Sequence, residues 1–306
     1  MKAAEIVAYR KDMEWKEYLV PGSLDEALEM LERYNGAARI IAGGTDIVPA
    51  TRKGATGIKA LVDITRIPGL NAIRLDGETV KIGPLATHTE VAHSALIRKR
   101  GMALAEGASR LGSPQIRNIG TVAGNIINAQ PGADTLIPLL ALDGSVTIRG
   151  SQGERTTPLT ELFTGVGRTT IDSTKEIVTQ ISFPGLGKGE TSAAMRLAKR
   201  KTLVLPILTV AVVVGTEPGA KSFTRVHIAV GPVATTPFRC KAAEEILAGS
   251  PVSEEVIRRA AAEAAKAANP RTSLIRGTSE YRKAMVAVLV ERGIATALKR
   301  LEENNG

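Results

Sequence analysis

Ile41-Ala42-Gly43-Gly44-Thr45-Asp46-Ile47 and, later in the chain, Thr121-Val122-Ala123-Gly124-Asn125 are the two stretches that decide how this sequence is interpreted. Each follows or interrupts an apolar stretch, and each contains glycine, which lacks a Cβ and tolerates positive φ. Backbone N–H groups in such segments stay open to an approaching anion. Two of them in one domain predict that the chain holds a pyrophosphate, and therefore a nucleotide-type cofactor.

The first stretch has a simpler interpretation, because Gly43-Gly44 taken alone fits a turn after a strand better than a phosphate site. The second stretch is more specific, since Thr121, Asn125 and the later Asp134 add polar groups that a turn does not need. Neither is a Rossmann fingerprint: the nearest approach, Gly165-Val166-Gly167, lacks the third glycine, and no P-loop sequence occurs. We therefore expect a dinucleotide site of a non-Rossmann kind.

Length and composition indicate an ordinary globular protein. The 306 residues are enough for two domains or one large one, and 43% are hydrophobic and 23% charged. Cys240 is the single cysteine, so neither a disulfide nor a cysteine-ligated iron–sulfur cluster can form within the chain. His88, His93 and His227 are too scattered for a zinc site, and we expect them to be structural or surface residues, with no metal bound.

The charge pattern excludes two further classes. The net charge is +9, but only 3% of the residues are aromatic, too few for a base-stacking platform, so we expect no nucleic-acid binding. The longest apolar run, Leu203 to Gly215, is shorter than the ~20 residues of a membrane span. The N-terminus lacks the apolar core of a signal peptide, which predicts a cytoplasmic protein. Part of the basic surface is available to dock a partner subunit.

The first third of the chain predicts a small βαβ unit. Ser23 to Glu26 forms a capping box that opens a helix ending near Gly36. Strands are expected at 38–42 and 60–64. Further along, Asp76-Gly77 predicts a hairpin, and Thr87 with Glu90 forms a second capping box. The helix that opens at Thr87 is expected to run towards Ile97. We also expect a helix over 102–111 and a strand over 145–149.

The last third has a different pattern. We expect an antiparallel sheet followed by three helices, and a domain boundary near 174–178. The predicted strands are 177–183, 193–197, 209–214 and 225–230, and the predicted helices are 239–247, 253–268 and 280–298.

Taken together, these motifs resemble the FAD-binding medium subunit of the molybdenum hydroxylases, the family that includes the flavoprotein subunits of xanthine dehydrogenase and of aerobic carbon monoxide dehydrogenase. The resemblance spans nearly the whole chain, and the order and spacing of its motifs are more specific than any one of them. The motifs are Pro21-x-Ser23-Leu24-x-Glu26-Ala27, Ala42 to Asp46, Thr121-x-x-Gly124-Asn125 with Asp134, and Gly231-Pro232-Val233-Ala234-x-Thr236-Pro237-x-Arg239.

The resemblance implies an α+β chain. Residues 1–176 would form a two-subdomain FAD-binding fold of the vanillyl-alcohol-oxidase/molybdopterin-dehydrogenase type, with subdomains at about 1–58 and 59–176. Residues 177–306 would form a smaller C-terminal flavoprotein domain of antiparallel sheet and helices.

The resemblance also implies which residues hold FAD and gives roles to some of them. Backbone amides of the two stretches would wrap the pyrophosphate, the hydroxyls of Thr45 and Thr121 would add hydrogen bonds, and Asp134 would lie by a ribose hydroxyl. Asp134 has an alternative interpretation as the cap of a turn after Pro131-Gly132. The implied cofactor-binding residues are Ile41, Ala42, Gly43, Gly44, Thr45, Asp46, Ile47, Thr121, Ala123, Gly124, Asn125, Asp134 and Arg196.

Arg196 matches a position where relatives often carry a lysine near the flavin, and a cation there would stabilise negative charge near flavin N1. The basic stretch from Met195 to Lys201 is equally consistent with a surface segment. Two departures from the family pattern stand out. Ala123 replaces a frequent glycine, and Thr202-Leu203-Val204 stands where an acidic residue is common.

By resemblance, the chain is the FAD-carrying electron-transfer subunit of a heteromeric, cytoplasmic complex, and the resemblance implies a dimer of trimers. A small subunit with two-iron two-sulfur clusters would deliver electrons, and a large subunit would hold molybdopterin. FAD would pass electrons to NAD, a quinone or another acceptor. No general acid or base is expected in this chain, because the redox chemistry belongs to the cofactor. The organic substrate is not identified by the sequence.

Two other functions stay open. An autonomous flavin oxidase of the vanillyl-alcohol-oxidase type would need a cap domain and often a covalent flavin link through His or Cys, and both residues are scarce here. A basic scaffold protein, in which both glycine stretches are turns, would be colourless.

Overall fold

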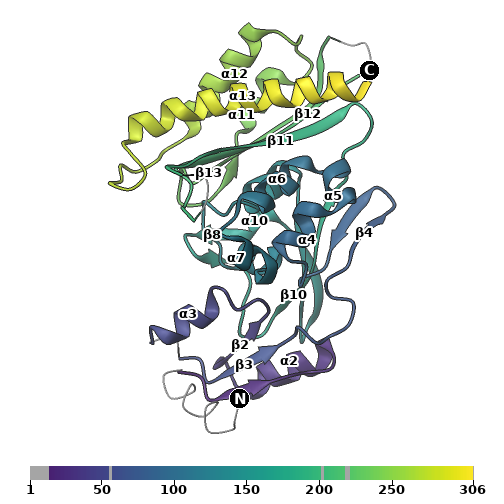
Figure 1. Cartoon of the computed structure of the whole chain (residues 1–306), viewed down its shortest axis with the longest axis vertical. Helices are drawn as coiled ribbons and strands as arrows, with labels where there is room; N and C mark the ends of the chain where they lie inside the picture. Colours follow the sequence, from purple (N-terminus) through teal and green to yellow (C-terminus); the bar gives the residue numbers. More distant parts are fainter. Residues whose placement is uncertain (1–13, 55–56, 201–202, 218–220, 306) are drawn as a thin grey trace.

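The computed structural model describes residues 14–54, 57–200, 203–217 and 221–305. Predictions that concern the first thirteen residues or Lys201 lie outside this range. The described chain forms three parts that follow one another along the longest axis of the molecule (Figure 1). Each part is built on its own sheet.

The N-terminal part is a three-stranded sheet in the order β1-β3-β2, with parallel neighbours. The predicted βαβ unit is thus confirmed. Ser23 caps the first helix, because its hydroxyl accepts a hydrogen bond from the backbone N–H of Glu26 at 3.2 Å. The Glu26 carboxylate bonds to the N–H of Gly22 instead of that of Ser23. The elements are β1 Glu17–Leu19, α2 Leu24–Arg33, β2 Ala38–Ile41, α3 Ile47–Arg52 and β3 Ala60–Asp63.

The middle part is an antiparallel five-stranded sheet in the order β4-β5-β10-β6-β7, covered by short helices. Gly77 turns the predicted hairpin with φ of +59°. The Thr87–Glu90 capping box is confirmed, but the helix ends at Ser94, whose extended backbone starts a second helix. The elements are β4 Ile73–Asp76, β5 Thr79–Ile82, α4 His88–His93, α5 Ala95–Arg100, α6 Met102–Arg110, α7 Pro114–Ile119, α8 Val122–Ile127, α9 Leu136–Ala141, β6 Ser145–Gly150, β7 Gly153–Pro158, α10 Leu159–Leu162, β8 Phe163–Gly165, β9 Arg168–Thr169 and β10 Ile177–Pro184.

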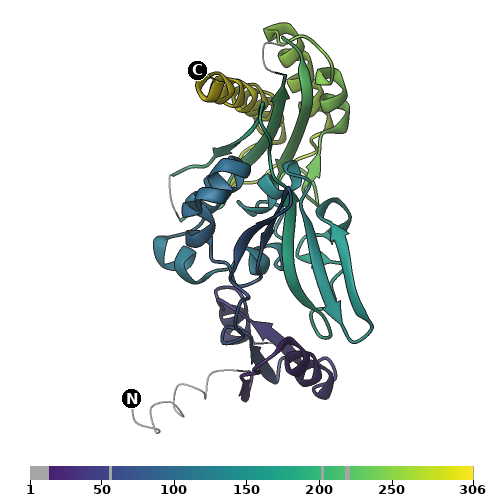
Figure 2. The same ribbon diagram turned by 90° about the vertical axis from the view of Figure 1, so that its right-hand side faces the viewer.

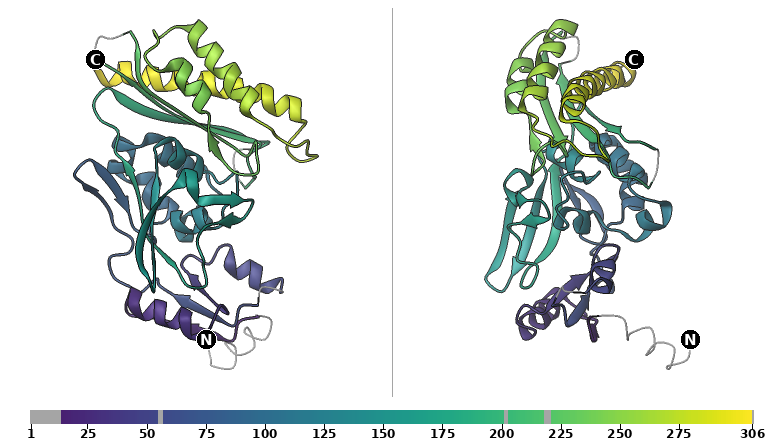
Figure 3. Two further views of the ribbon diagram at one scale, coloured as in Figure 1. Left: turned by 180° about the vertical axis from the view of Figure 1, so that it is seen from behind. Right: turned by 90° about the vertical axis from the view of Figure 1, so that its left-hand side faces the viewer.

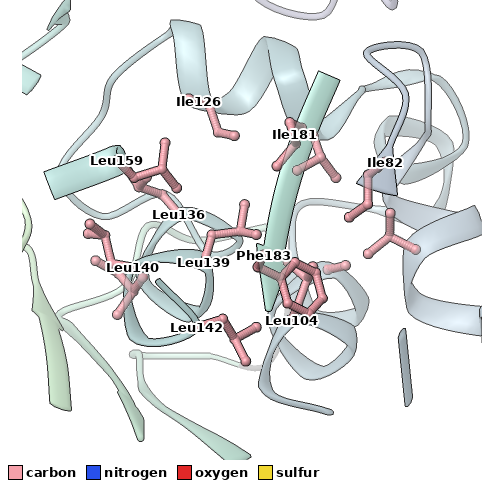
Figure 4. Packing of buried hydrophobic residues seen from close by; sticks show 14 of the residues in the cluster. Ile82, Leu104, Ile126, Leu136, Leu139, Leu140, Leu142, Leu159, Ile181 and Phe183 are labelled. Atoms are coloured by element: carbon pink, nitrogen blue, oxygen red, sulfur yellow. The ribbon is translucent and has the colours of Figure 1, made fainter. Parts of the chain in front are cut away.

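The core of the middle part lies between its sheet and its helices. Leu104 of α6 and Leu139 of α9 point toward Ile181 and Phe183 of β10, and all four side chains are buried (Figure 4). Burying a side chain of this size stabilises the fold by about 1.5–3 kcal/mol. This core fixes α8 and the segment before it against the sheet.

Strand β10 corrects one prediction. We placed residues 177–183 in the C-terminal sheet, but this strand pairs with β5 and β6 of the middle sheet. The apolar pattern marks a strand without showing its partner, so the sequence could not tell the two sheets apart. The boundary that the pairing supports follows Pro184 and not residue 176.

The C-terminal part is an antiparallel sheet, β11-β12-β13-β14, with three helices on one face. Its central strand β12 is buried on both faces: Val210 and Val212 pack with the helices, whereas Ala211 and Val213 pack into the core of the middle part. Figures 2 and 3 show the sheet between the long helix α13 and the middle part. The elements are β11 Glu190–Leu197, β12 Leu208–Thr216, β13 Phe223–Gly231, β14 Phe238–Arg239, α11 Lys241–Leu247, α12 Glu254–Ala267 and α13 Ser279–Asn305.

None of the helices in the described part of the chain has the length and apolar character needed to cross a membrane.

Candidate functional site

A cavity with a volume of about 1380 Å³ is lined by residues from all three parts. This volume exceeds the ~300–1,000 Å³ that is usual for a small-molecule pocket. Both glycine stretches of the sequence line the cavity, as do Asp134, the segment Leu203 to Leu205 and residues around Pro232. The structure therefore brings the two stretches together around one space.

The first stretch is the connection between β2 and α3. Ala42 to Ile47 all line the cavity, whereas Ile41 turns inward and packs with Leu61. Gly44 has φ of +70°, which favours glycine. Gly43 lies so close to the second stretch that a Cβ would clash with the carbonyl oxygen of Ile119. The two glycines thus permit the close approach of two segments as well as access to the cavity.

The second stretch is the start of a helix, which differs from the open loop suggested by its glycine. Thr121 is the N-cap of α8, and its hydroxyl accepts the N–H of Gly124 at 3.1 Å. Threonine favours this position because its oxygen satisfies an otherwise free helix donor. Ala123, Gly124 and Asn125 line the cavity. The N–H of Gly124 is therefore already engaged.

A hydrogen bond joins the ends of the two stretches. The amide of Asn128, just after α8, donates to the Asp46 carboxylate at 2.9 Å. Partial burial raises the pKa of Asp46. Within α8, the Asn125 side-chain oxygen accepts a hydrogen bond from the hydroxyl of Thr135 at 2.6 Å. These bonds fix the polar wall of the cavity, and both use residues close to the predicted site.

Asp134 and Arg196 form a buried ion pair. Arg196 Nε lies 2.9 Å from Asp134 Oδ1, and both side chains are less than a tenth exposed. Burial raises the pKa of Asp134, and the guanidinium opposes that shift. Arg196 also donates to the carbonyl oxygen of Val204 at 2.5 Å. Asp134 lines the cavity but Arg196 does not, so the arginine lies behind the aspartate and fixes the segment Leu203 to Leu205.

His88 is a cavity residue that the sequence analysis missed. Its side chain is 2% exposed, and Nδ1 has no hydrogen-bond partner among the described residues. It adjoins Gly120, where a Cβ would lie 3.4 Å from both His88 Cδ2 and Thr45 Oγ1. Burial, with a smaller effect from Arg117, lowers the pKa of His88 to about 4. The capping box at Thr87 predicts that a helix begins at His88, but it does not predict that the His88 side chain lines a cavity.

The other two histidines match the structural or surface roles expected of them. His93 is exposed on α4, and His227 bonds through Nδ1 to the carbonyl oxygen of Ala141 at 2.8 Å. Cys240 is buried, and burial raises its thiol pKa to about 12. Among the described residues, no group of three or more His, Cys, Asp or Glu side chains is placed to hold a metal.

Comparison with known proteins gives the family. Residues 11–186 match the FAD binding domain in molybdopterin dehydrogenase, and residues 193–297 match the C-terminal domain of the carbon monoxide dehydrogenase flavoprotein. This chain is an FAD-binding medium subunit of the molybdenum hydroxylase family. It is an oxidoreductase subunit of a kind found in heteromeric complexes.

Several relatives match this medium subunit over most of its length. It is 34% identical to subunit alpha of the 6-hydroxypseudooxynicotine dehydrogenase complex of Paenarthrobacter nicotinovorans, covering 93% of this chain and 95% of that one. It is 31% identical to the carbon monoxide dehydrogenase medium chain of Hydrogenophaga pseudoflava, covering 93% and 97%. A solved carbon monoxide dehydrogenase from Hydrogenophaga pseudoflava superposes with a TM-score of 0.88 at 30% identity, covering 94% and 99%.

The cavity of this medium subunit fits the FAD that its family carries. The residues that line it include both glycine stretches and part of the C-terminal domain. Gly43 and Gly120 let the segments that form its wall approach one another closely, and His88 Nδ1 is a buried polar atom that lacks a partner among the described residues. A buried group of this kind costs stability unless a ligand or water satisfies it.

The Asp134–Arg196 pair gives a stability prediction. Arg196→Gln leaves a buried carboxylate without its cation, so we expect the free energy of unfolding in urea to fall by about 3 kcal/mol. Adding Asp134→Asn should restore most of that loss, because the uncompensated charge is then gone. Equal destabilisation in the single and double variants would show that the pairing contributes nothing.

His88 gives a prediction about pH. Its pKa is lower in the folded chain than its ordinary value of about 6.5, so the unfolded chain binds the extra proton first. The stability that depends on a neutral His88 is complete above about pH 6.5 and is lost as the pH falls toward 4. That loss amounts to about 3 kcal/mol.

Urea unfolding of the FAD-free protein between pH 7 and pH 4 measures this effect. His88→Gln should flatten the decline in stability, because the group that takes up the proton is removed. His93→Gln, which removes an exposed imidazole from the same helix, is the control and should decline as the unaltered protein does. The same decline in all three proteins would contradict the assignment to His88.

Proposed function

We propose that this chain is the FAD-carrying electron-transfer subunit of a molybdenum hydroxylase complex, and that its two glycine stretches hold the FAD pyrophosphate. The observation that carries the proposal is the single cavity that both stretches line. Bound FAD supplies the redox chemistry, taking up electrons and passing them on. The chain itself binds and orients the cofactor and shields it from water.

The residues divide this task. Backbone N–H groups of residues 42–47 and the hydroxyl of Thr45 are proposed to bind phosphate oxygens. Because the side chains there are small, a phosphate can come close enough to bond to the backbone, and few Lys or Arg side chains are needed. Thr121 accepts from Gly124 with its oxygen, so its own hydroxyl proton is available to donate to an acceptor. His88, neutral at pH 7, has one ring N–H to donate.

Asp134 is proposed to accept a hydrogen bond from a ribose hydroxyl. Among the described contacts, Arg196 binds only Oδ1 of Asp134. The other carboxylate oxygen, Oδ2, is therefore available to a ligand. Arg196 is a positioning residue in this proposal: it acts on the site through Asp134 and through Val204. Its position behind Asp134 favours this role over the direct contact with flavin that the resemblance suggested.

The partners are proposed from the relatives. Their names describe a medium chain and a complex subunit, which supports a heteromeric complex. The family resemblance supplies the proposed partners, a small iron–sulfur subunit that delivers electrons and a large subunit that holds molybdopterin. The acceptor of the electrons is proposed to be NAD, a quinone or another small oxidant. We also propose a cytoplasmic location for the complex.

The visible absorption spectrum of the purified chain, followed by chromatography of the flavin that acid releases, tests this function. We expect a yellow protein that releases free FAD. Flavin that stays attached after denaturation would favour an autonomous oxidase with a covalent link. A colourless protein that added FAD cannot reconstitute would leave the scaffold interpretation.

Gly43→Ala tests the role of the first stretch. The added methyl group meets the carbonyl oxygen of Ile119, so the loop must move away from the second stretch. We expect FAD to bind about tenfold more weakly, the effect of losing about one hydrogen bond to a charged group. Quenching of flavin fluorescence during titration of FAD into the cofactor-free protein measures the affinity.

Gly22→Ala is the matched control, because a Cβ there would meet only the Glu26 carboxylate at 3.5 Å, away from the cavity. Far-ultraviolet circular dichroism verifies that both variants fold. If the two alanine variants bind FAD equally well, the first stretch does not hold the cofactor.

A further inference from the structure

Three arginines line the same cavity on its C-terminal side. Arg271 and Arg276 lie in the connection between α12 and α13, and Arg282 lies in the first turn of α13. Arg271 is exposed, Arg276 is half-buried and Arg282 is only 4% exposed. Their positive charge therefore gathers on one wall of the cavity.

These arginines lack counter-charges, unlike two of the acids that line the same cavity. Asp134 is paired with Arg196, and Glu176 is paired with Arg155. Within the described ranges, no carboxylate lies in ion-pair distance of Arg271, Arg276 or Arg282. The excess positive charge at this wall is thus not neutralised by the described chain.

Arg282 shows the imbalance most clearly. Its Nη1 donates to the carbonyl oxygen of Arg271 at 2.9 Å and its Nη2 to that of Pro232, but its buried Nε has no partner among the described residues. Burial lowers its pKa, and Arg276 lowers it further. A cation in the first turn of a helix is also disfavoured by the helix dipole. An anion near Arg276 and Arg282 would relieve all three costs.

The arginine wall lies apart from the first glycine stretch. The connection between α12 and α13 and the helix α3 lie on the same side of the molecule, with the middle part between them (Figures 1 and 3). FAD is larger than a drug-sized ligand, and the cavity volume of about 1380 Å³ is correspondingly larger than the ~300–1,000 Å³ of an ordinary small-molecule pocket. The separation of the arginine wall from the first glycine stretch is what distinguishes the two ends of this cavity.

We propose that Arg271, Arg276 and Arg282 form a second anion site, which binds the phosphate group of a small molecule other than FAD. Guanidinium groups suit phosphate because their planar N–H forks make paired, charge-assisted hydrogen bonds. Two carbonyl oxygens hold the Arg282 side chain, whereas the side chains of Arg271 and Arg276 make no hydrogen bond among the described residues that would have to break on binding. The site is thus partly formed before the ligand arrives.

The inference rests on the proposed function only in that FAD occupies the glycine end of the cavity. The experiment therefore begins by measuring the FAD content of each protein. The FAD-loaded chain is then titrated with inorganic phosphate and, separately, with ribose 5-phosphate, by calorimetry in a phosphate-free buffer. Failure to hold FAD would concern the proposed function, whereas failure to bind phosphate with FAD in place would concern this site.

Arg271→Gln/Arg276→Gln is the test variant, because neither side chain is buried and neither makes a hydrogen bond or ion pair with the described residues. We expect unchanged FAD content and phosphate binding that is at least about tenfold weaker. Arg259→Gln/Arg292→Gln removes two exposed charges from α12 and α13 outside the cavity, and it should bind phosphate as the unaltered chain does.

Tighter binding of ribose 5-phosphate would assign the site to a phosphorylated metabolite, and equal binding would assign it to the free ion; both results support the site. Three results would overturn it. These are no phosphate binding to the FAD-loaded chain, equal weakening in both double variants, or binding that only the FAD-free protein shows and that FAD abolishes.

Discussion

The two-sided burial of β12 is the constraint on which the arrangement of the molecule depends. Successive side chains of a strand point to opposite faces, so Val210 and Val212 enter the core beneath the C-terminal helices while Ala211 and Val213 enter the core of the middle part. The sheet cannot slide or rotate without exposing one of these sets. The cavity, whose walls come from all three parts, includes residues of the two parts that this strand holds together.

Polar contacts reinforce the same interface at its edges. Glu106 of α6 accepts the backbone N–H of Ala194 in the edge strand β11, and it also binds Arg300 of α13. At the other edge, Arg239 joins Asp143 of the middle part to Glu244 of α11. Such pairs leave few buried charges uncompensated, which is the condition under which buried ions are tolerated.

The cavity follows two electrostatic patterns. Around the glycine stretches its wall is built from backbone, small side chains and the neutral His88, which suits a pyrophosphate that is bound by N–H groups. Its acids are held by partners, as Asp134 is by Arg196. The C-terminal wall instead carries Arg276 and Arg282 without carboxylates among the described residues. One cavity thus offers two distinct environments for anions.

The sequence by itself determined many of the elements and the family. Capping boxes, the Asp76-Gly77 turn and the apolar periods are local signals, and the spaced motifs are specific when taken together. Only the tertiary structure decided which sheet takes β10, that Arg196 lies behind Asp134, and that His88 faces the cavity. Strand partners and side-chain neighbours are contacts between residues far apart in the chain, and no local pattern encodes them.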